Sequence, residues 1–265
     1  MKRLASLLVS QRSALLAALL VAQLASGMVK PASAADAAPL PKVIIDQDAF
    51  GPGGSDIQSI LMLMQDKDVD LLGICVVTGD GWRNEEVSHA LRILETAHRA
   101  AVPVHPGAVF PLLDGRRRSL AWERLYGNYF YDGAFMSHWP AESTVDWTPL
   151  HPTKSYWVPP LSKGEPSIHA PRESAVSFML RMVHEYPHQA TIIAAVLLTD
   201  LALAGKRDPK FATLAKQLVF WYPWAAASIR SRRTPPLLGR TTTPPRREFN
   251  VRWDPEAASI TLRQP

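Results

Sequence analysis

Three aspartates stand close together where the regular folded sequence begins. Asp46 ends an apolar run at residues 42–46, and Asp48 lies two residues further on. Asp56 follows the Gly-rich stretch 49–55. Carboxylates gathered in one place repel one another unless they share a proton or a cation. Ca²⁺ accepts carboxylate, carbonyl and water oxygens in a loose geometry, so this spacing indicates a calcium site. The simpler alternative is that Asp48 and Asp56 only cap the turn and the next helix, for which Ser55 or Asp56 is the expected N-cap.

The elements around these aspartates predict one α/β domain. The expected strands are 42–46, 70–78 and 102–104, and the expected helices are 56–65 and 84–100. Strands that alternate with helices pair in parallel through right-handed crossovers. We therefore predict an open, mostly parallel, Rossmann-like sheet flanked by helices. Ligands bind at the C-terminal edge of such a sheet, where the aspartates lie.

The second half of the chain is less uniform. Residues 111–171 are rich in Trp, Tyr, Pro and Gly and predict an excursion of loops and short helices, of the kind that forms a lid. Its aromatic run 122–139 predicts either stacking on a nucleobase or ordinary packing. Further elements are expected as a helix at 173–186, a strand at 190–198, a helix from Thr199 and a strand at 218–222.

Residues 221–246 differ from the sequence on either side. They are dense in Arg, Pro and Thr and have no usable periodicity. They are either a genuine insertion or the product of a locally shifted reading frame, and we favour the second.

The motifs, taken in this order, resemble the inosine/uridine-preferring nucleoside hydrolases. DQDAFGPGGSD, which ends at Asp56, is similar to the family's first aspartate cluster DxDxGxDD, with Ser55 in place of one carboxylate. By this resemblance Asp48 is a metal ligand and the base that activates water, and Asp56 is a second metal ligand. VTGD, which ends at Asp80, is similar to the family's second strand ending, where an asparagine meets the substrate.

Two later segments extend the resemblance. AAVLLTDLA, residues 194–202, is similar to the segment whose backbone carbonyl binds the metal, and Ala195 would supply that carbonyl. Val196 and Leu197 replace a glycine-containing pair there and are expected to crowd the backbone. Glu248 and Asn250 lie in an EFN segment like the one that contacts ribose in the family. The DPEAA segment then begins at Asp254, an expected N-cap.

The resemblance implies hydrolysis of the N-ribosidic bond of nucleosides, with Ca²⁺ as cofactor and a nucleoside as the small-molecule partner. Members of the family carry a late His-Asp pair that ligates the metal and assists departure of the base, and this sequence ends before it. We therefore expect a C-terminally truncated, incomplete domain with reduced or no activity. The alternatives are an inactive secreted nucleoside- or sugar-binding protein and a non-functional truncated product. A homo-oligomer is left open.

The N-terminus predicts export. Residues 1–34 combine basic residues, an apolar run at 14–24 and small residues, as in a secretory signal peptide. Residues 35–41 are then a tether to the domain at 42–265, and the protein is expected to be periplasmic or secreted, without stable membrane association after cleavage. The formal charge of +5 does not indicate a nucleic-acid partner, because six arginines concentrate between residues 221 and 247.

Two other motifs compete with this interpretation. HEYPH, residues 184–188, matches the zinc-protease pattern HExxH, which needs both histidines on one helix face, and Pro187 breaks that helix. The DxD at a strand end also opens haloacid dehalogenase-like phosphohydrolases, whose chemistry needs a later lysine and leaves Asp56 unexplained. Cys75 is the only cysteine and lies in an apolar run, so a buried structural thiol is expected.

Overall fold

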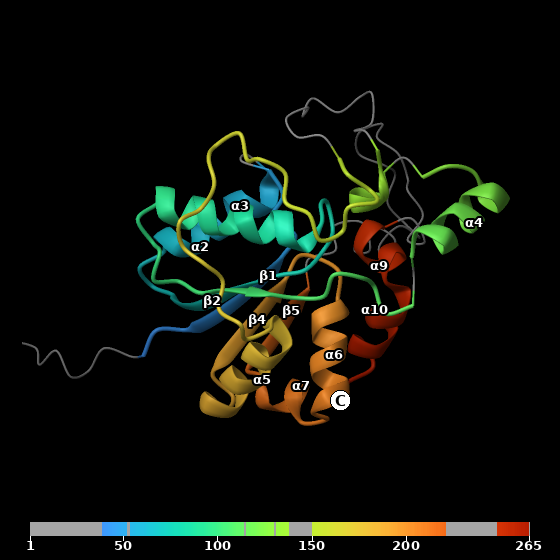
Figure 1. Ribbon diagram of the computed structural model, residues 1–265. Coiled ribbons are helices and arrows are strands. Elements are labelled where there is room, and N and C mark those ends of the chain that lie inside the picture. The colour runs from blue at the N-terminus through green and yellow to red at the C-terminus, as the bar shows by residue number, and fades with distance from the viewer. Residues whose placement is uncertain are drawn as a thin grey trace, which may run out of the picture. The chain divides into compact units, whose positions relative to one another are not determined.

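A five-stranded parallel sheet forms the centre of the domain (Figure 1). The computed structural model describes residues 39–51, 54–113, 115–129, 131–137, 150–220 and 248–264. The strand order is β3-β2-β1-β4-β5, and every pairing is parallel. The strands are β1 (Lys42–Gln47), β2 (Asp70–Val76), β3 (Val104–Pro106), β4 (Ala190–Ala194) and β5 (Gln217–Phe220). The predicted open parallel sheet is therefore confirmed.

Helices cover both faces of this sheet, with α2 and α3 on one face and α5, α6 and α7 on the other (Figure 1). The helices in the first half of the chain are α2 (Ser55–Gln65), α3 (Arg83–Thr96) and α4 (Arg116–Tyr126). A short 3₁₀ helix, η2 (Gly133–Phe135), follows them. The later helices are α5 (Ala175–Glu185), α6 (Thr199–Arg207), α7 (Phe211–Leu214), α9 (Phe249–Trp253) and α10 (Pro255–Thr261).

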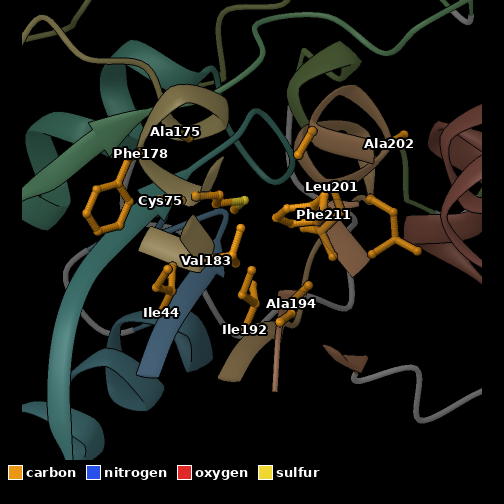
Figure 2. Packing of buried hydrophobic residues seen from close by; sticks show 14 of the residues in the cluster. Ile44, Cys75, Ala175, Phe178, Val183, Ile192, Ala194, Leu201, Ala202 and Phe211 are labelled. Atoms are coloured by element: carbon orange, nitrogen blue, oxygen red, sulfur yellow. The ribbon is translucent and has the colours of Figure 1, made fainter. Parts of the chain in front are cut away.

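Alternation along β1 divides the core into two layers. Ile44 packs with Phe178 of α5 on one face, and Ile45 packs with residues of α2 and α3 on the other. Neighbouring side chains of a strand point to opposite faces, so a strand covered on both sides is apolar throughout. Cys75 lies in the same layer as Ile44 and Ile192 and is fully buried, which confirms a structural thiol (Figure 2).

Several predicted boundaries need correction. The N-cap of α2 is Gly54, which makes no side-chain cap, and neither Ser55 nor Asp56 caps the helix. The strand expected at 190–198 ends at Ala194, because Val196 and Leu197 turn away and pack in a separate cluster. The strand expected at 102–104 begins only at Val104.

Other expectations are confirmed or lie outside the described residues. The excursion at 111–171 contains α4 and η2 with irregular chain around them, although 138–149 are not described. Helix α5 ends at Glu185, and His188 has a φ of 60°, so the HExxH histidines do not share a continuous helix. Residues 1–38 and 221–247 lie outside the described part, which leaves the signal peptide and the Arg/Pro-rich segment as predictions. Among the helices described, none has the length and apolar character of a membrane span.

Candidate functional site

The C-terminal ends of β1 and β2 bring Asp48 and Asp80 together. Gln47 pairs with Val76 in the sheet, so the turns that follow these two residues lie side by side. The backbone N–H of Asp80 donates a hydrogen bond to Asp48 Oδ2 over 3.1 Å. Gly79 makes this approach possible, because a Cβ at that position would lie 2.1 Å from Asp48 Oδ2. The sequence therefore places a glycine where two acidic turns must touch.

Asp56 joins this pair from the first turn of α2. Burial raises the pKa of Asp48 well above its usual value, and the negative charge of Asp56 raises it further. Burial also raises the pKa of Asp56 from 3.8 to about 7, with a further contribution from the charge of Asp80. The pKa of Asp80 rises to about 6, chiefly through burial. The three carboxyl groups therefore lie within electrostatic reach of one another, as expected for Asp48 and Asp56.

Glu86, which the sequence reasoning missed, adds a fourth carboxylate. It lies in the first turn of α3, is fully buried, and accepts a hydrogen bond from the N–H of Gly81 over 2.6 Å through Oε1. Its Oε2 has no hydrogen-bond partner among the described residues. Burial raises the pKa of Glu86, and the charges of Asp80 and Asp56 add to the rise. The sequence signal was an acidic residue in the first turn of the helix that follows the VTGD turn.

Tyr131, a second missed residue, reaches the cluster from the excursion. Its hydroxyl donates to Asp80 Oδ1 over 2.7 Å. Burial and the charge of Asp80 raise the pKa of Tyr131 well above its usual value, so the phenol keeps its proton and acts as a donor. The nearby Phe135 packs against Trp82 and Trp253, with ring centroids 5.8 and 4.3 Å away. Ordinary packing therefore accounts for Phe135, whereas Tyr131 contacts a site residue.

A second acidic pair, Asp46 and Asp200, lies beneath this cluster. Both are fully buried, and burial raises both pKa values, that of Asp200 to about 7. Asp200 Oδ1 accepts from the N–H of Ala108 over 2.9 Å. Asp200 Oδ2 and both carboxyl oxygens of Asp46 have no hydrogen-bond partner in the described part of the chain. A Cβ at Gly107 would lie 1.9 Å from Asp200 Oδ2, so this glycine is also required.

Ala195 lies at the same edge of the sheet. It follows Ala194, which pairs with Asp46, and its N–H donates to the carbonyl of Asp46 over 3.2 Å. Val196 and Leu197 are both buried in an apolar cluster with Trp253. The cluster accounts for these larger side chains, and the expected crowding of the backbone at Ala195 stays a prediction.

Glu248 and Asn250 are not brought into the acidic cluster. Glu248 Oε2 accepts from the N–H of Val251 over 2.7 Å, so this carboxylate caps α9. Across the described ranges, no hydrogen bond or ion pair joins Glu248 or Asn250 to Asp48, Asp56 or Asp80. Asp254 caps α10 through the N–H of Ala257, which confirms its predicted N-cap role.

The donor set of the acidic cluster fits a hard cation. The cluster consists of Asp48, Asp56, Asp80 and Glu86, and no lysine or arginine lowers any of these pKa values. Carboxylate and carbonyl oxygens are the ligands that Ca²⁺ takes. In the described residues, no three His, Cys, Asp or Glu side chains already converge as a metal site. The chemistry of the donor set thus suits Ca²⁺.

Comparisons with known proteins point in one direction. The family model described as "Inosine-uridine preferring nucleoside hydrolase" matches residues 43–265. Uridine nucleosidase 1 of Arabidopsis thaliana is 31% identical over 222 residues, which cover 83% of this chain and 53% of that protein. Probable uridine nucleosidase 1 of Oryza sativa subsp. japonica is 28% identical over 223 residues, which cover 83% of this chain and 55% of that protein. The chain spans about half the length of the curated relatives it matches.

Solved structures share the fold. A plant nucleoside hydrolase superposes with a TM-score of 0.54 at 23% identity, over 84% of this chain and 56% of that one. The inosine-uridine preferring nucleoside hydrolase of Bacillus anthracis superposes with a TM-score of 0.52 at 19% identity, over 85% and 62%. At these identities the likeness establishes the fold alone.

Proposed function

The chain belongs to the inosine-uridine preferring nucleoside hydrolase family, whose model matches residues 43–265, and we propose that it hydrolyses the N-ribosidic bond of nucleosides to base and ribose. The observation that carries this proposal is the acidic cluster at the ends of β1 and β2, which is partly to fully buried and whose raised pKa values no lysine or arginine lowers. Such a cluster is costly for folding, and it suits a site that binds a cation and stabilises developing positive charge.

Asp48, Asp56 and the backbone carbonyl of Ala195 are the proposed Ca²⁺ ligands. Bound calcium would lower the pKa of a water molecule and hold ribose hydroxyls. Support comes from the position of all three at one edge of the sheet and from the charge of Asp56, which raises the pKa of Asp48. We propose calcium as the cofactor, because carboxylate and carbonyl oxygens are the hard ligands that calcium prefers.

Asp48 is the proposed general base. The N–H of Asp80 holds its Oδ2, which fixes the orientation of the carboxylate that would receive a proton from water. A base works best when its pKa lies near the working pH, and burial shifts Asp48 in that direction. As the N-ribosidic bond to the nucleobase breaks, positive charge develops on the ribose ring, and the surrounding carboxylates stabilise that charge.

Asp80, Glu248 and Asn250 are the proposed substrate contacts. Asp80 has the best support, because it lies in the cluster itself. Glu248 is already engaged as the cap of α9, so it would contact ribose only through its remaining acceptor capacity. The nucleoside remains the proposed partner, and no nucleic-acid partner is proposed.

One alternative keeps binding and omits catalysis. Ser55 stands where the family motif has a carboxylate, and the capping role of Glu248 leaves it less acceptor capacity for ribose. These two observations favour a secreted nucleoside- or sugar-binding protein without turnover. The haloacid dehalogenase-like alternative is dropped, because the family match covers the same aspartates. Export to the periplasm or medium remains a proposal, which N-terminal sequencing of the mature protein would test.

The test is release of ribose from uridine and inosine, measured with calcium and with chelator. We expect turnover that is lost on chelation and that falls by about 10²- to 10⁴-fold in Asp48→Asn. Asp68→Asn, a change at an exposed aspartate, is the matched control and should leave turnover unchanged. Calorimetric binding of nucleoside without turnover would favour the binding protein. Turnover that survives both chelation and Asp48→Asn would refute the proposed mechanism.

A further inference from the structure

The hydroxyl of Tyr131 is placed on a site carboxylate by a segment far away in sequence. Tyr131 and Asp80 are 51 residues apart, yet the Oη to Oδ1 distance is 2.7 Å. A carboxylate only accepts hydrogen bonds, and a phenol can donate one, so the two groups match. Asp80 Oδ2 has no hydrogen-bond partner among the described residues, so it can accept one from a ligand.

The segment that carries Tyr131, residues 131–136, is fastened directly to the turn that carries Asp80. The N–H of Ala134 donates to the carbonyl of Gly79 over 2.9 Å. Gly133 has a φ of 51°, and a Cβ there would lie 2.2 Å from the same carbonyl. The positive φ and this close approach both require glycine at residue 133, and they fix the distance between residues 131–136 and the turn at Gly79. The position of Tyr131 relative to Asp80 is therefore set by the backbone.

Helix α9 fastens the same segment from the other side through Arg252. Its Nη1 donates to Asp132 Oδ1 over 2.7 Å, and its Nη2 donates to the carbonyl of Tyr131 over 2.6 Å. The side chains of Arg252 and Asp132 are only 8% and 4% exposed. The guanidinium also lies 3.7 Å from the ring centroid of Tyr129. A buried ion pair contributes little net stability, but its two-pronged geometry fixes orientation.

We propose that Tyr131 is a positioning residue for substrate: its hydroxyl holds one oxygen of Asp80, the other oxygen accepts a nucleoside hydroxyl, and Arg252 holds Tyr131 in place. This inference rests on the proposed function, because it assumes that Asp80 contacts the nucleoside. By this inference, the excursion at 111–171 contributes a polar contact near the ribose, and Tyr131 does not stack on the nucleobase.

The geometry also explains why an acidic residue suits position 80. A tyrosine hydroxyl donates into a carboxylate more strongly than into a neutral amide. The pair Asp80 and Tyr131 thus holds its place through one charge-assisted hydrogen bond. Removal of the hydroxyl alone leaves Asp80 Oδ1 without its donor and free to rotate.

The experiment compares Tyr131→Phe with wild type by KM, kcat and calorimetric nucleoside affinity at saturating calcium. We expect KM and the dissociation constant to rise about ten- to a hundredfold, as for loss of a hydrogen bond to a charged group, with kcat changed little. Tyr126→Phe is the matched control, because Tyr126 lies in the same excursion and is 64% exposed. It should leave both constants unchanged.

A double variant distinguishes positioning from a general effect on folding. If Tyr131 acts through Asp80, Tyr131→Phe should change nothing further in an Asp80→Ala background. A folding effect would persist there and would also lower the melting temperature. Arg252→Lys keeps the charge but loses the two-pronged contact, so we expect it to weaken nucleoside binding in the same direction.

Each outcome separates this inference from the proposed function. Wild type that releases ribose while Tyr131→Phe has unchanged affinity overturns the inference and leaves the function standing. Wild type that binds nucleoside without turnover, and binds it more weakly after Tyr131→Phe, retains the inference and rejects catalysis. A wild type that neither binds nor hydrolyses nucleosides rejects both.

Discussion

The acidic cluster predicts an unusual dependence of stability on pH in the calcium-free protein. Burial raises the pKa of Asp56 to about 7 and that of Asp80 to about 6, whereas both are near 3.8 in the unfolded chain. A carboxyl with a raised pKa binds its proton more tightly when the protein is folded. The folded state is therefore favoured as the pH falls from about 7 towards 4, and it loses stability as the pH rises through that window.

The magnitude follows from the two pKa values. Between pH 8 and pH 5, protonation of a group with a folded pKa near 7 stabilises the fold by about 2–3 kcal/mol, and one near 6 by about 1–1.5 kcal/mol. Because Asp56 and Asp80 repel each other, their contributions are not additive, and we expect about 2–4 kcal/mol together. For a domain of this size, this corresponds to a rise in melting temperature of about 5–15 °C.

Calcium should remove this dependence, because the cation replaces the proton among the carboxylates. We expect the melting temperature in chelator to fall from pH 5 to pH 8, and calcium to restore it at pH 8. His89 and His105 act in the opposite direction, since burial lowers their pKa values and their protonation opposes folding below about pH 6.5. Asp56→Asn therefore serves as the reference, because it keeps both histidines and removes one carboxyl.

The decisive quantity is the difference in pH slope between wild type and Asp56→Asn, measured by scanning calorimetry in chelator. Equal slopes would refute the argument, because the raised pKa of Asp56 would then make no contribution to stability. A calcium effect of equal size in Asp48→Asn would show that the ion binds elsewhere.

Three further predictions follow from individual contacts. Gly79→Ala should weaken calcium binding, measured by calorimetry, about tenfold or more, because the added Cβ would collide with Asp48 Oδ2. A Cβ added in Gly115→Ala would meet no atom within 4 Å, so this control variant should bind calcium like the wild type. Phe178→Ala should lower the free energy of unfolding in urea by about 3–5 kcal/mol, compared with at most about 0.5 kcal/mol for the exposed Leu125→Ala. Asp254→Ala should cost about 2–3 kcal/mol in the same assay, since it removes the cap of α10 and the acceptor for Thr199 Oγ1, and equal stability would contradict that role.

The strands could be predicted because burial on both faces leaves a direct trace in the sequence. β1 matches its apolar run to within one residue, since every residue from Val43 to Ile45 is buried. The same rule failed at the end of β4. Residues 195–198 are as apolar as a strand, but residues 196–198 are apolar because they turn into packing with Trp253 and other core residues. Hydrophobicity records burial and does not record the direction of the chain.

The site could be predicted only where position along the chain implied position in space. Asp48, Asp56 and Asp80 follow strands or begin a helix at one edge of the sheet, so topology brings them together. Glu86 was missed because an acidic residue in the first turn of a helix is ordinarily explained by the helix dipole. Tyr131 was missed because its contact depends on how an aperiodic excursion docks, which no local pattern specifies.

Glycines keep the acidic groups close despite their repulsion. A Cβ at Gly79 would displace Asp48, one at Gly107 would displace Asp200, and one at Gly133 would lift the Tyr131 segment from Gly79. Larger residues at these places would separate the carboxylates and relieve the electrostatic cost, so local stability does not explain the arrangement. The cost is offset by two apolar layers that hold β1 and β2 rigid beneath the turns. A bound cation would stabilise a fold that holds unpaired carboxylates together in this way, so the proposed calcium binding would be coupled to folding of this edge of the sheet.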